Sequence, residues 1–209
     1  MYQQNAGDYV LIQDDPSLRF GEGDSFTYEA WYYSLSDAGE QHLMRKGDYA
    51  NYATTTNYAL RFQNGELFFY YYNEDNVIEA IVATTTVFLT ETWNHVAVSY
   101  DGSTNRVRLF INGAEVSGYD KGSWPASPAN PPYTSKDPVK KTSKLAIGTS
   151  YHSTDPDSSM LPFSGYVDEV RLSNTVRYNS SFIPSASPFV SDGNTVLPVS
   201  YTHLTLPTN

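Results

Sequence analysis

The pattern of apolar residues constrains this chain most, because it alternates with a period of two and nowhere follows the period of a helix. No window keeps apolar residues at positions i, i+3, i+4 and i+7 for three turns, as a surface helix requires. In the segment SFTYEAWYYSL (25–35) one face carries Phe26, Tyr28, Ala30 and Tyr32, and the other carries Thr27, Glu29, Trp31 and Tyr33. Such alternation is typical of a strand with one buried face.

Turn signals separate about a dozen such short segments. Further strands are expected at 8–12, 42–47, 77–84, 143–150 and 163–173, and hairpins are expected at Asn64-Gly65, near Asp101-Gly102 and at Asn112-Gly113. Asn-Gly and Asp-Gly supply the positive φ angles that a two-residue hairpin needs. The 18 Tyr and 10 Phe residues also favour strands over helices. This pattern predicts an all-β antiparallel sandwich, and 209 residues suffice for one such domain.

Composition excludes several function classes. The net charge of −10 argues against nucleic acid and anionic lipid as partners, since both require clustered Lys and Arg. The chain has no cysteine, which excludes a disulfide framework, a thiolate metal site and a Cys nucleophile. It also has no apolar run of the roughly 20 residues that span a membrane.

The end of the sequence differs in character from the rest. PVSYTHLTLPTN (198–209) resembles a transposase-insertion sequencing adapter translated in frame; a genuine polar tail is the alternative. We therefore expect a domain at 1–197, a non-native tail at 198–209, and a metagenomic parent protein that continues beyond Leu197 into neighbouring domains.

Several segments, in their order, resemble a known family. They are GDYVLI, FTYEAWYY, TWNHVAVSYDGSTNRVRLFINGAEV, LAIG and FSGYVDEVRLSNTVRY. Together they are similar to the laminin-G-like branch of the concanavalin A-like lectin/glucanase jelly rolls, over nearly all of residues 7–197. The resemblance implies two curved antiparallel sheets packed face to face and no organic cofactor. It also implies binding of glycans or proteins, and in many members a structural calcium ion; the wider superfamily includes glycoside hydrolases.

The adjacent acids Asp168 and Glu169 raise the question of catalysis. Neighbours on an extended strand face apart, so we expect that they cannot act together on one glycosidic bond, as a retaining glycosidase requires. The E-x-D-x-x-E spacing of the related hydrolases is absent, and Glu29 is a lone acid on its strand. The sequence therefore predicts a domain that is not an enzyme.

Calcium fits the oxygen-rich composition better than zinc does. The resemblance places an aspartate, Asp168, beside the first strand and near Asp8, which makes these two the expected ligands. Other oxygen-rich stretches contain Asp14, Asp15, Asp155 and Asp157. The alternative is that Asp168 caps backbone N–H groups.

Aromatic side chains supply the candidate saccharide contacts, because sugars present apolar C–H faces to rings. In ELFFYYYN, Leu67, Phe69 and Tyr71 fit the inward positions and Phe68, Tyr70 and Tyr72 the outward ones. Arg61 is expected on the same outward face of the partner strand. The proline-rich loop 118–143 adds Tyr119, Trp124 and Tyr133. Outward tyrosines that pack under loops are the alternative. Trp93 and His95, in WNHVAV, are interpreted as structural.

These observations favour a non-catalytic recognition module that binds a cell-surface or matrix carbohydrate. We expect it to belong to an extracellular, secreted or virion-associated protein such as an adhesin or a phage tail protein. A structural or protein-interaction domain of a virion or surface protein is the alternative, and a divergent glycoside hydrolase is less favoured.

Overall fold

The computed structural model of the chain describes residues 9–63, 66–83, 89–116, 118–120, 136–155, 160–199 and 204–205, with the backbone alone for 80–83, 118–120, 199 and 204–205. These residues form two seven-stranded sheets, and every strand pair in them is antiparallel. The predicted all-β sandwich is therefore confirmed. No helix in this part of the chain is long and apolar enough to span a membrane.

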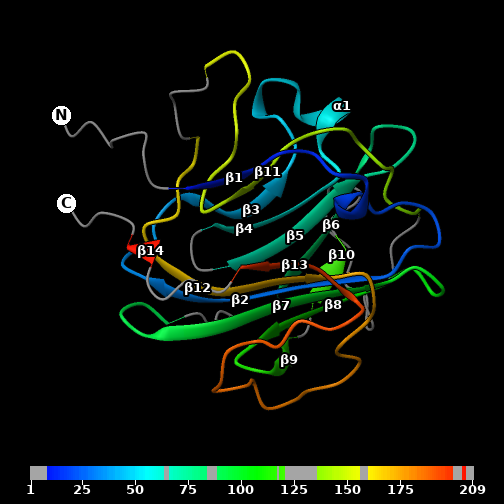
Figure 1. Cartoon of the computed structure of the whole chain (residues 1–209). Helices are drawn as coiled ribbons and strands as arrows, with labels where there is room; N and C mark the ends of the chain where they lie inside the picture. The colour runs from blue at the N-terminus through cyan, green and yellow to red at the C-terminus, as the bar shows by residue number, and fades with distance from the viewer. Residues whose placement is uncertain are drawn as a thin grey trace.

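Sheet A and sheet B form the two layers of the molecule (Figure 1). Sheet A has the order β1 (Val10–Ile12), β11 (Leu145–Ile147), β3 (Glu40–Lys46), β4 (Tyr58–Gln63), β5 (Glu66–Tyr72), β6 (Ile78–Ala83) and β10 (Gly118–Asp120). Sheet B has the order β13 (Thr195–Val199), β12 (Gly165–Ser173), β2 (Phe26–Ser34), β7 (Trp93–Asp101), β8 (Arg106–Ile111) and β9 (Ala114–Val116), and β14 (Leu204–Thr205) pairs with β12. The three short helices are η1 (Pro16–Leu18), η2 (Tyr49–Asn51) and the single-turn α1 (Tyr52–Thr55).

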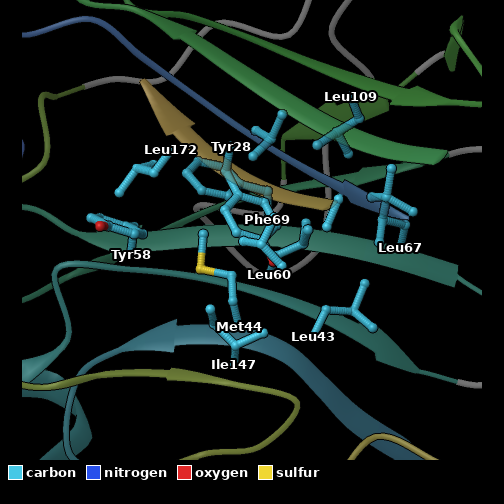
Figure 2. Close-up of a cluster of buried hydrophobic side chains, with 14 of the residues drawn as sticks. Tyr28, Leu43, Met44, Tyr58, Leu60, Leu67, Phe69, Leu109, Ile147 and Leu172 are labelled. Carbon is cyan, nitrogen blue, oxygen red and sulfur yellow. The ribbon is translucent and has the colours of Figure 1, made fainter. Parts of the chain in front are cut away.

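The core lies between the sheets, where the inward side chains of both layers meet (Figure 2). Tyr28 from β2 and Leu172 from β12 meet Leu60, Phe69 and other residues of sheet A there. All four side chains are fully buried, as the alternation of apolar residues predicts. Burying one side chain of this size stabilises the fold by roughly 1.5–3 kcal/mol.

Two of the expected turns are short hairpins, and the third is longer. Gln63 pairs with Glu66, and Ile111 pairs with Ala114, so two residues connect the strands in each case. Asp101 instead pairs with Arg106, and four residues connect β7 to β8. The glycine of this turn, Gly102, serves close packing rather than a positive φ, since a Cβ there would lie 2.5 Å from the Asp24 carbonyl oxygen.

Residues 174–194, here named the covering segment, follow β12 and run along the outside of sheet B; Figure 1 shows them in orange beside β8 and β9. Their backbone is attached to the sheet where the Phe182 N–H donates to the Gly113 carbonyl oxygen at 2.8 Å. Arg177 forms an ion pair with Asp192 at 2.7 Å, which holds the two ends of the segment together. The covering segment therefore closes part of the outer face of sheet B.

Candidate functional site

A β-bulge interrupts β12 at the two carboxylates singled out by the sequence. Asp168 pairs with Trp31 and Arg171 pairs with Glu29, so two residues of β12 oppose the single residue Ala30 of β2. A bulge of this kind adds one residue to a strand and changes the direction of the side chain there. The inward residues are Val167, Val170 and Leu172. Asp168 and Glu169 consequently share the outer face of sheet B, and the expectation that they face apart is wrong.

The bulge holds Glu169 in the left-handed region, with φ at 49°. A residue other than glycine in this conformation carries strain of about 1–3 kcal/mol, which persists only where neighbouring groups compensate it. Two hydrogen bonds do so: the Glu169 N–H donates to Asp168 Oδ1 at 2.8 Å, and the Phe189 N–H donates to Glu169 Oε2 at 2.7 Å. Backbone groups of β12 and of the covering segment thus fix both carboxylates.

Two tryptophans complete the surface beside these carboxylates. Trp31 lies on β2, directly opposite Asp168, and Trp93 begins β7, where 40% of it is exposed. The ring of Tyr33 contacts Trp93 edge-on, with centroids 5.7 Å apart. A groove of about 400 Å³, here named the β12 groove, is lined by Trp31, Trp93, Asp168, Glu169, Ser185, Ala186, Ser187 and Pro188. Its carboxylates come from β12 and its aromatic rings from β2 and β7.

A buried ion-pair network lies beside the groove and fastens the covering segment to it. The Glu29 carboxylate is fully buried, and its Oε1 accepts from Arg171 Nη2 at 2.6 Å and from Nε at 2.8 Å. Its Oε2 accepts from the Tyr178 hydroxyl at 2.8 Å and lies 3.1 Å from His95 Nε2. Burial alone would raise the pKa of the Glu29 carboxyl, but the hydrogen bond from His95 and the charge of Arg171 hold it below its usual value.

Aromatic rings enclose the same network. The His95 ring contacts Trp31 on the groove side, with centroids 5.3 Å apart, and it contacts Phe182 and Phe189 of the covering segment edge-on. The Arg171 guanidinium lies 4.4 Å from the centre of the Phe189 ring. His95 is therefore structural, as predicted, whereas the prediction that Trp93 is only structural misses its exposure at the groove.

The predicted aromatic platform on sheet A is largely covered. Tyr70 and Tyr72 point outward as expected, yet only 5% and 7% of these residues are exposed. Tyr70 lies under the Arg61 guanidinium, 5.5 Å from its ring centre, and the Tyr72 ring packs near Tyr52 at the start of α1. Arg61 itself pairs with Glu40 at 2.6 Å. Neither tyrosine offers the open ring face that stacking on a sugar requires, so the structure does not support this platform.

Of the three aromatic residues that the sequence predicts as ligand contacts in the loop 118–143, the structure describes only Tyr119. Trp124 and Tyr133 lie outside the described residues. Tyr119 falls within β10, where its backbone pairs with Val82 of β6 at the edge of sheet A, and not in a loop. Their contact with a ligand stays a prediction.

The expected calcium site stays a prediction, because the structure describes only one of its two expected ligands, Asp168. The first strand, β1, pairs with β11 in sheet A, whereas β12 pairs with β2 and β13 in sheet B, so Asp168 is not beside the first strand in its sheet. Asp8 lies outside the described residues. Within the described ranges, no group of three or more His, Cys, Asp or Glu side chains is placed to hold a metal ion. Asp14, another candidate, instead pairs with Lys46 at 2.6 Å.

Sequence reasoning missed Trp31 and Trp93 as functional candidates. The signal was present, since Trp31 alternates with the core residues Ala30 and Tyr32 and must therefore face outward. What the local pattern does not show is which part of that outer face the covering segment leaves open.

Comparison with known proteins agrees with this architecture. The laminin-G-like family model of the concanavalin A-like lectin/glucanases superfamily matches residues 4–180. No curated protein matches the chain.

Among solved structures, a Bacteroides ovatus protein assigned a carbohydrate-binding role is similar over 94% of this chain and 50% of its own, with 21% identity and a TM-score of 0.57. The Ruminococcus gnavus IT-sialidase CBM40 bound to α2,3 sialyllactose is similar over 84% of this chain and 95% of its own, with 15% identity and a TM-score of 0.56. The botulinum neurotoxin serotype D ligand binding domain, in complex with N-acetylneuraminic acid, is similar over 84% and 39%, with 11% identity and a TM-score of 0.55. The chain thus spans half or less of the Bacteroides and botulinum chains. By its family match and its fold, the chain belongs to the concanavalin A-like lectin/glucanases superfamily.

Proposed function

We propose that the domain is a non-catalytic carbohydrate-recognition module that binds a saccharide in the β12 groove. The observation that carries the proposal is an exposed tryptophan, Trp93, beside a second one, Trp31, in a groove that also contains carboxylates and serines. Aromatic faces bind the apolar side of a sugar ring, and polar groups at the rim fix its orientation. The structural neighbours named above that are solved with sialyllactose or N-acetylneuraminic acid support the same class of ligand.

The arrangement favours binding over hydrolysis. A glycosidase places its two carboxyl groups on either side of the scissile bond. In the β12 groove both carboxylates come from consecutive residues of one strand, and the tryptophans lie on β2 and β7, the next two strands of sheet B. We propose that the module displays this groove at the surface of an extracellular or virion-associated protein, where several copies would strengthen weak binding.

The test is saccharide binding by the wild-type chain and by two tryptophan variants. A glycan array first identifies a ligand, and titration calorimetry then measures its affinity. Trp93→Ala is expected to weaken binding at least tenfold, about 1.4 kcal/mol, because the exposed stacking ring is lost. Trp124→Ala tests separately the ligand contact that the sequence predicts for the loop 118–143.

The other possible outcomes distinguish this proposal from its alternatives. Loss of binding in Trp124→Ala alone would move the site to the loop 118–143 and refute the groove. Absence of binding to any glycan would refute carbohydrate recognition and favour the structural or protein-interaction alternative. Release of reducing sugar from a polysaccharide would refute a non-catalytic role.

A further inference from the structure

A line of aromatic side chains crosses the outer face of sheet B next to the β12 groove. Tyr33 of β2 pairs with Trp93 of β7 on one side and with Tyr166 of β12 on the other. Residues that pair directly across antiparallel strands lie on the same face of the sheet. These three residues, here named the aromatic row, therefore span three neighbouring strands, and Trp93 also lines the groove.

Contacts between the rings hold the aromatic row in place. The Tyr33 ring meets those of Trp93 and Tyr166 edge-on, with centroids 5.7 and 5.6 Å apart. Aromatic pairs favour this arrangement because the positive edge of one ring meets the negative face of the other. All three residues stay accessible, since Trp93 is 40% exposed and both tyrosines are partly exposed. The rings therefore form a surface that is ordered before any ligand binds.

The two tyrosines of the aromatic row differ from those of the core. In the core, the hydroxyls of Tyr58 and Tyr71 donate to backbone carbonyl oxygens. Within the described part of the chain, the hydroxyls of Tyr33 and Tyr166 form no hydrogen bond. Accessible rings with unpaired hydroxyls can contact the apolar face of a sugar and hydrogen-bond to its polar groups.

The aromatic row forms one side of the groove, and the covering segment forms the other. Glu29, Trp31 and Tyr33 are successive residues on the outer face of β2. Glu29 is bonded to Tyr178 of the covering segment, Trp31 lines the groove, and Tyr33 belongs to the aromatic row. The groove therefore runs across the strands, with residues 185–188 on one side and the aromatic row on the other.

We infer, resting on the proposed function, that this surface binds an extended polysaccharide along its length and not a single terminal sugar. Each step of the aromatic row is close to the length of one sugar unit in an extended chain. A 1→4-β-linked chain leaves the apolar faces of its successive rings uncovered. Neighbouring sugar units contact successive rings, with Trp93 at one end of the bound stretch and Tyr166 at the other.

The experiment measures how affinity depends on chain length. Titration calorimetry is performed with 1→4-β-linked oligomers of glucose, of mannose and of N-acetylglucosamine, from two to six units long. In the series that binds most tightly, we expect the tetrasaccharide to bind at least tenfold more tightly than the disaccharide. The hexasaccharide should gain less than threefold over the tetrasaccharide, because the aromatic row has three rings.

Variants assign the length dependence to the aromatic row. Tyr166→Ala should lower the affinity for the tetrasaccharide at least fivefold and leave that for the disaccharide within twofold, because Trp93 and Tyr33 remain. Trp93→Ala should weaken both, and Tyr166→Phe, which keeps the ring, should retain most of the gain with length. Tyr52→Ala is the control, since it removes a tyrosine that is 55% exposed on α1, and it should change neither affinity. Thermal melts establish that every variant is folded.

The failure of this inference is distinguishable from the failure of the proposed function. Equal affinity for the disaccharide and the tetrasaccharide overturns the extended-chain site but leaves saccharide binding intact, and so does a Tyr166→Ala variant that keeps the full gain with length. Absence of binding by all three series also overturns the inference, and a short glycan that binds on an array would then still support saccharide recognition. If the array is negative as well, carbohydrate recognition itself fails.

Discussion

The buried carboxylate of Glu29 is expected to contribute more to stability than any other single acid described above. It is fully buried and accepts two hydrogen bonds from Arg171 and one from the Tyr178 hydroxyl. Glu29→Gln keeps the shape of the side chain but removes the charge that compensates Arg171. Removing one partner of a buried ion pair costs about 3–5 kcal/mol, because the other charge remains buried. Since 12% of the Arg171 side chain is exposed and water relieves part of this cost, we expect about 3 kcal/mol.

The assay is guanidinium unfolding followed by tryptophan fluorescence, together with a thermal melt. A loss of about 3 kcal/mol lowers Tm by roughly 6–12 °C in a chain of this length. The matched control is Glu74→Gln, which removes an acid whose side chain is 71% exposed and whose partner is Lys136. Such an exposed pair contributes at most about 1 kcal/mol.

A second variant separates the loss of charge compensation from a general loss of packing. In Glu29→Gln/Arg171→Met the uncompensated cation is absent, and we expect the double variant to be more stable than Glu29→Gln alone. The reasoning is refuted if Glu29→Gln costs less than about 1 kcal/mol, or if removing Arg171 in its background destabilises the fold further.

Three further predictions concern separate parts of the molecule. The hydrogen bond from Arg19 and the neighbouring Lys46 lower the pKa of Asp14 from 3.8 to about 2. Its contribution to the free energy of unfolding is therefore present above pH 3.8 and is lost as the pH falls toward 2. Chemical unfolding at a series of pH values should show this loss, and Asp14→Asn should reduce the dependence on pH. Gly113→Ala places a Cβ 2.0 Å from the Phe182 carbonyl oxygen, at a φ of 77°. The substitution should lower the free energy of unfolding by about 2 kcal/mol or more and speed proteolysis within the covering segment. Unchanged proteolysis would contradict the attachment of this segment at Gly113. Calcium binding stays a prediction: millimolar calcium should raise Tm, a chelator should reverse the rise and Asp168→Asn should abolish it, and no change in Tm would exclude the site.

The fold could be predicted from the sequence because its main signal is local. A strand repeats every two residues, so each alternating segment fixes which side chains face the core, and Phe26, Tyr28 and Tyr32 are all buried as their positions require. The two Asn-Gly turns add the connections between neighbouring strands. Near Asp101-Gly102 the chain folds back as predicted, but through four residues instead of two. Gly102 is needed there because Gly23 and Asp24, which are distant in sequence, leave no room for a side chain.

The candidate site was less predictable, because two of its determinants are not local. The bulge appears in the sequence only as a change of spacing, with core residues at 167, 170 and 172 and two polar residues in the first interval. The exposure of Trp93 and the burial of Tyr70 depend on what lies over each sheet. The segments that cover the sheets, such as 174–194, are not strands, so the alternation of apolar residues does not predict where they lie.

Because of the bulge, the groove can change during evolution without a change in the core. Because Glu169 is the additional residue, deleting its codon would restore Val167, Val170 and Leu172 to every second position, with no buried side chain displaced from its layer. A lineage of such domains can therefore acquire or discard the second negative charge by a single in-frame indel. Ligand preference can diverge in this way between close relatives whose interiors remain the same.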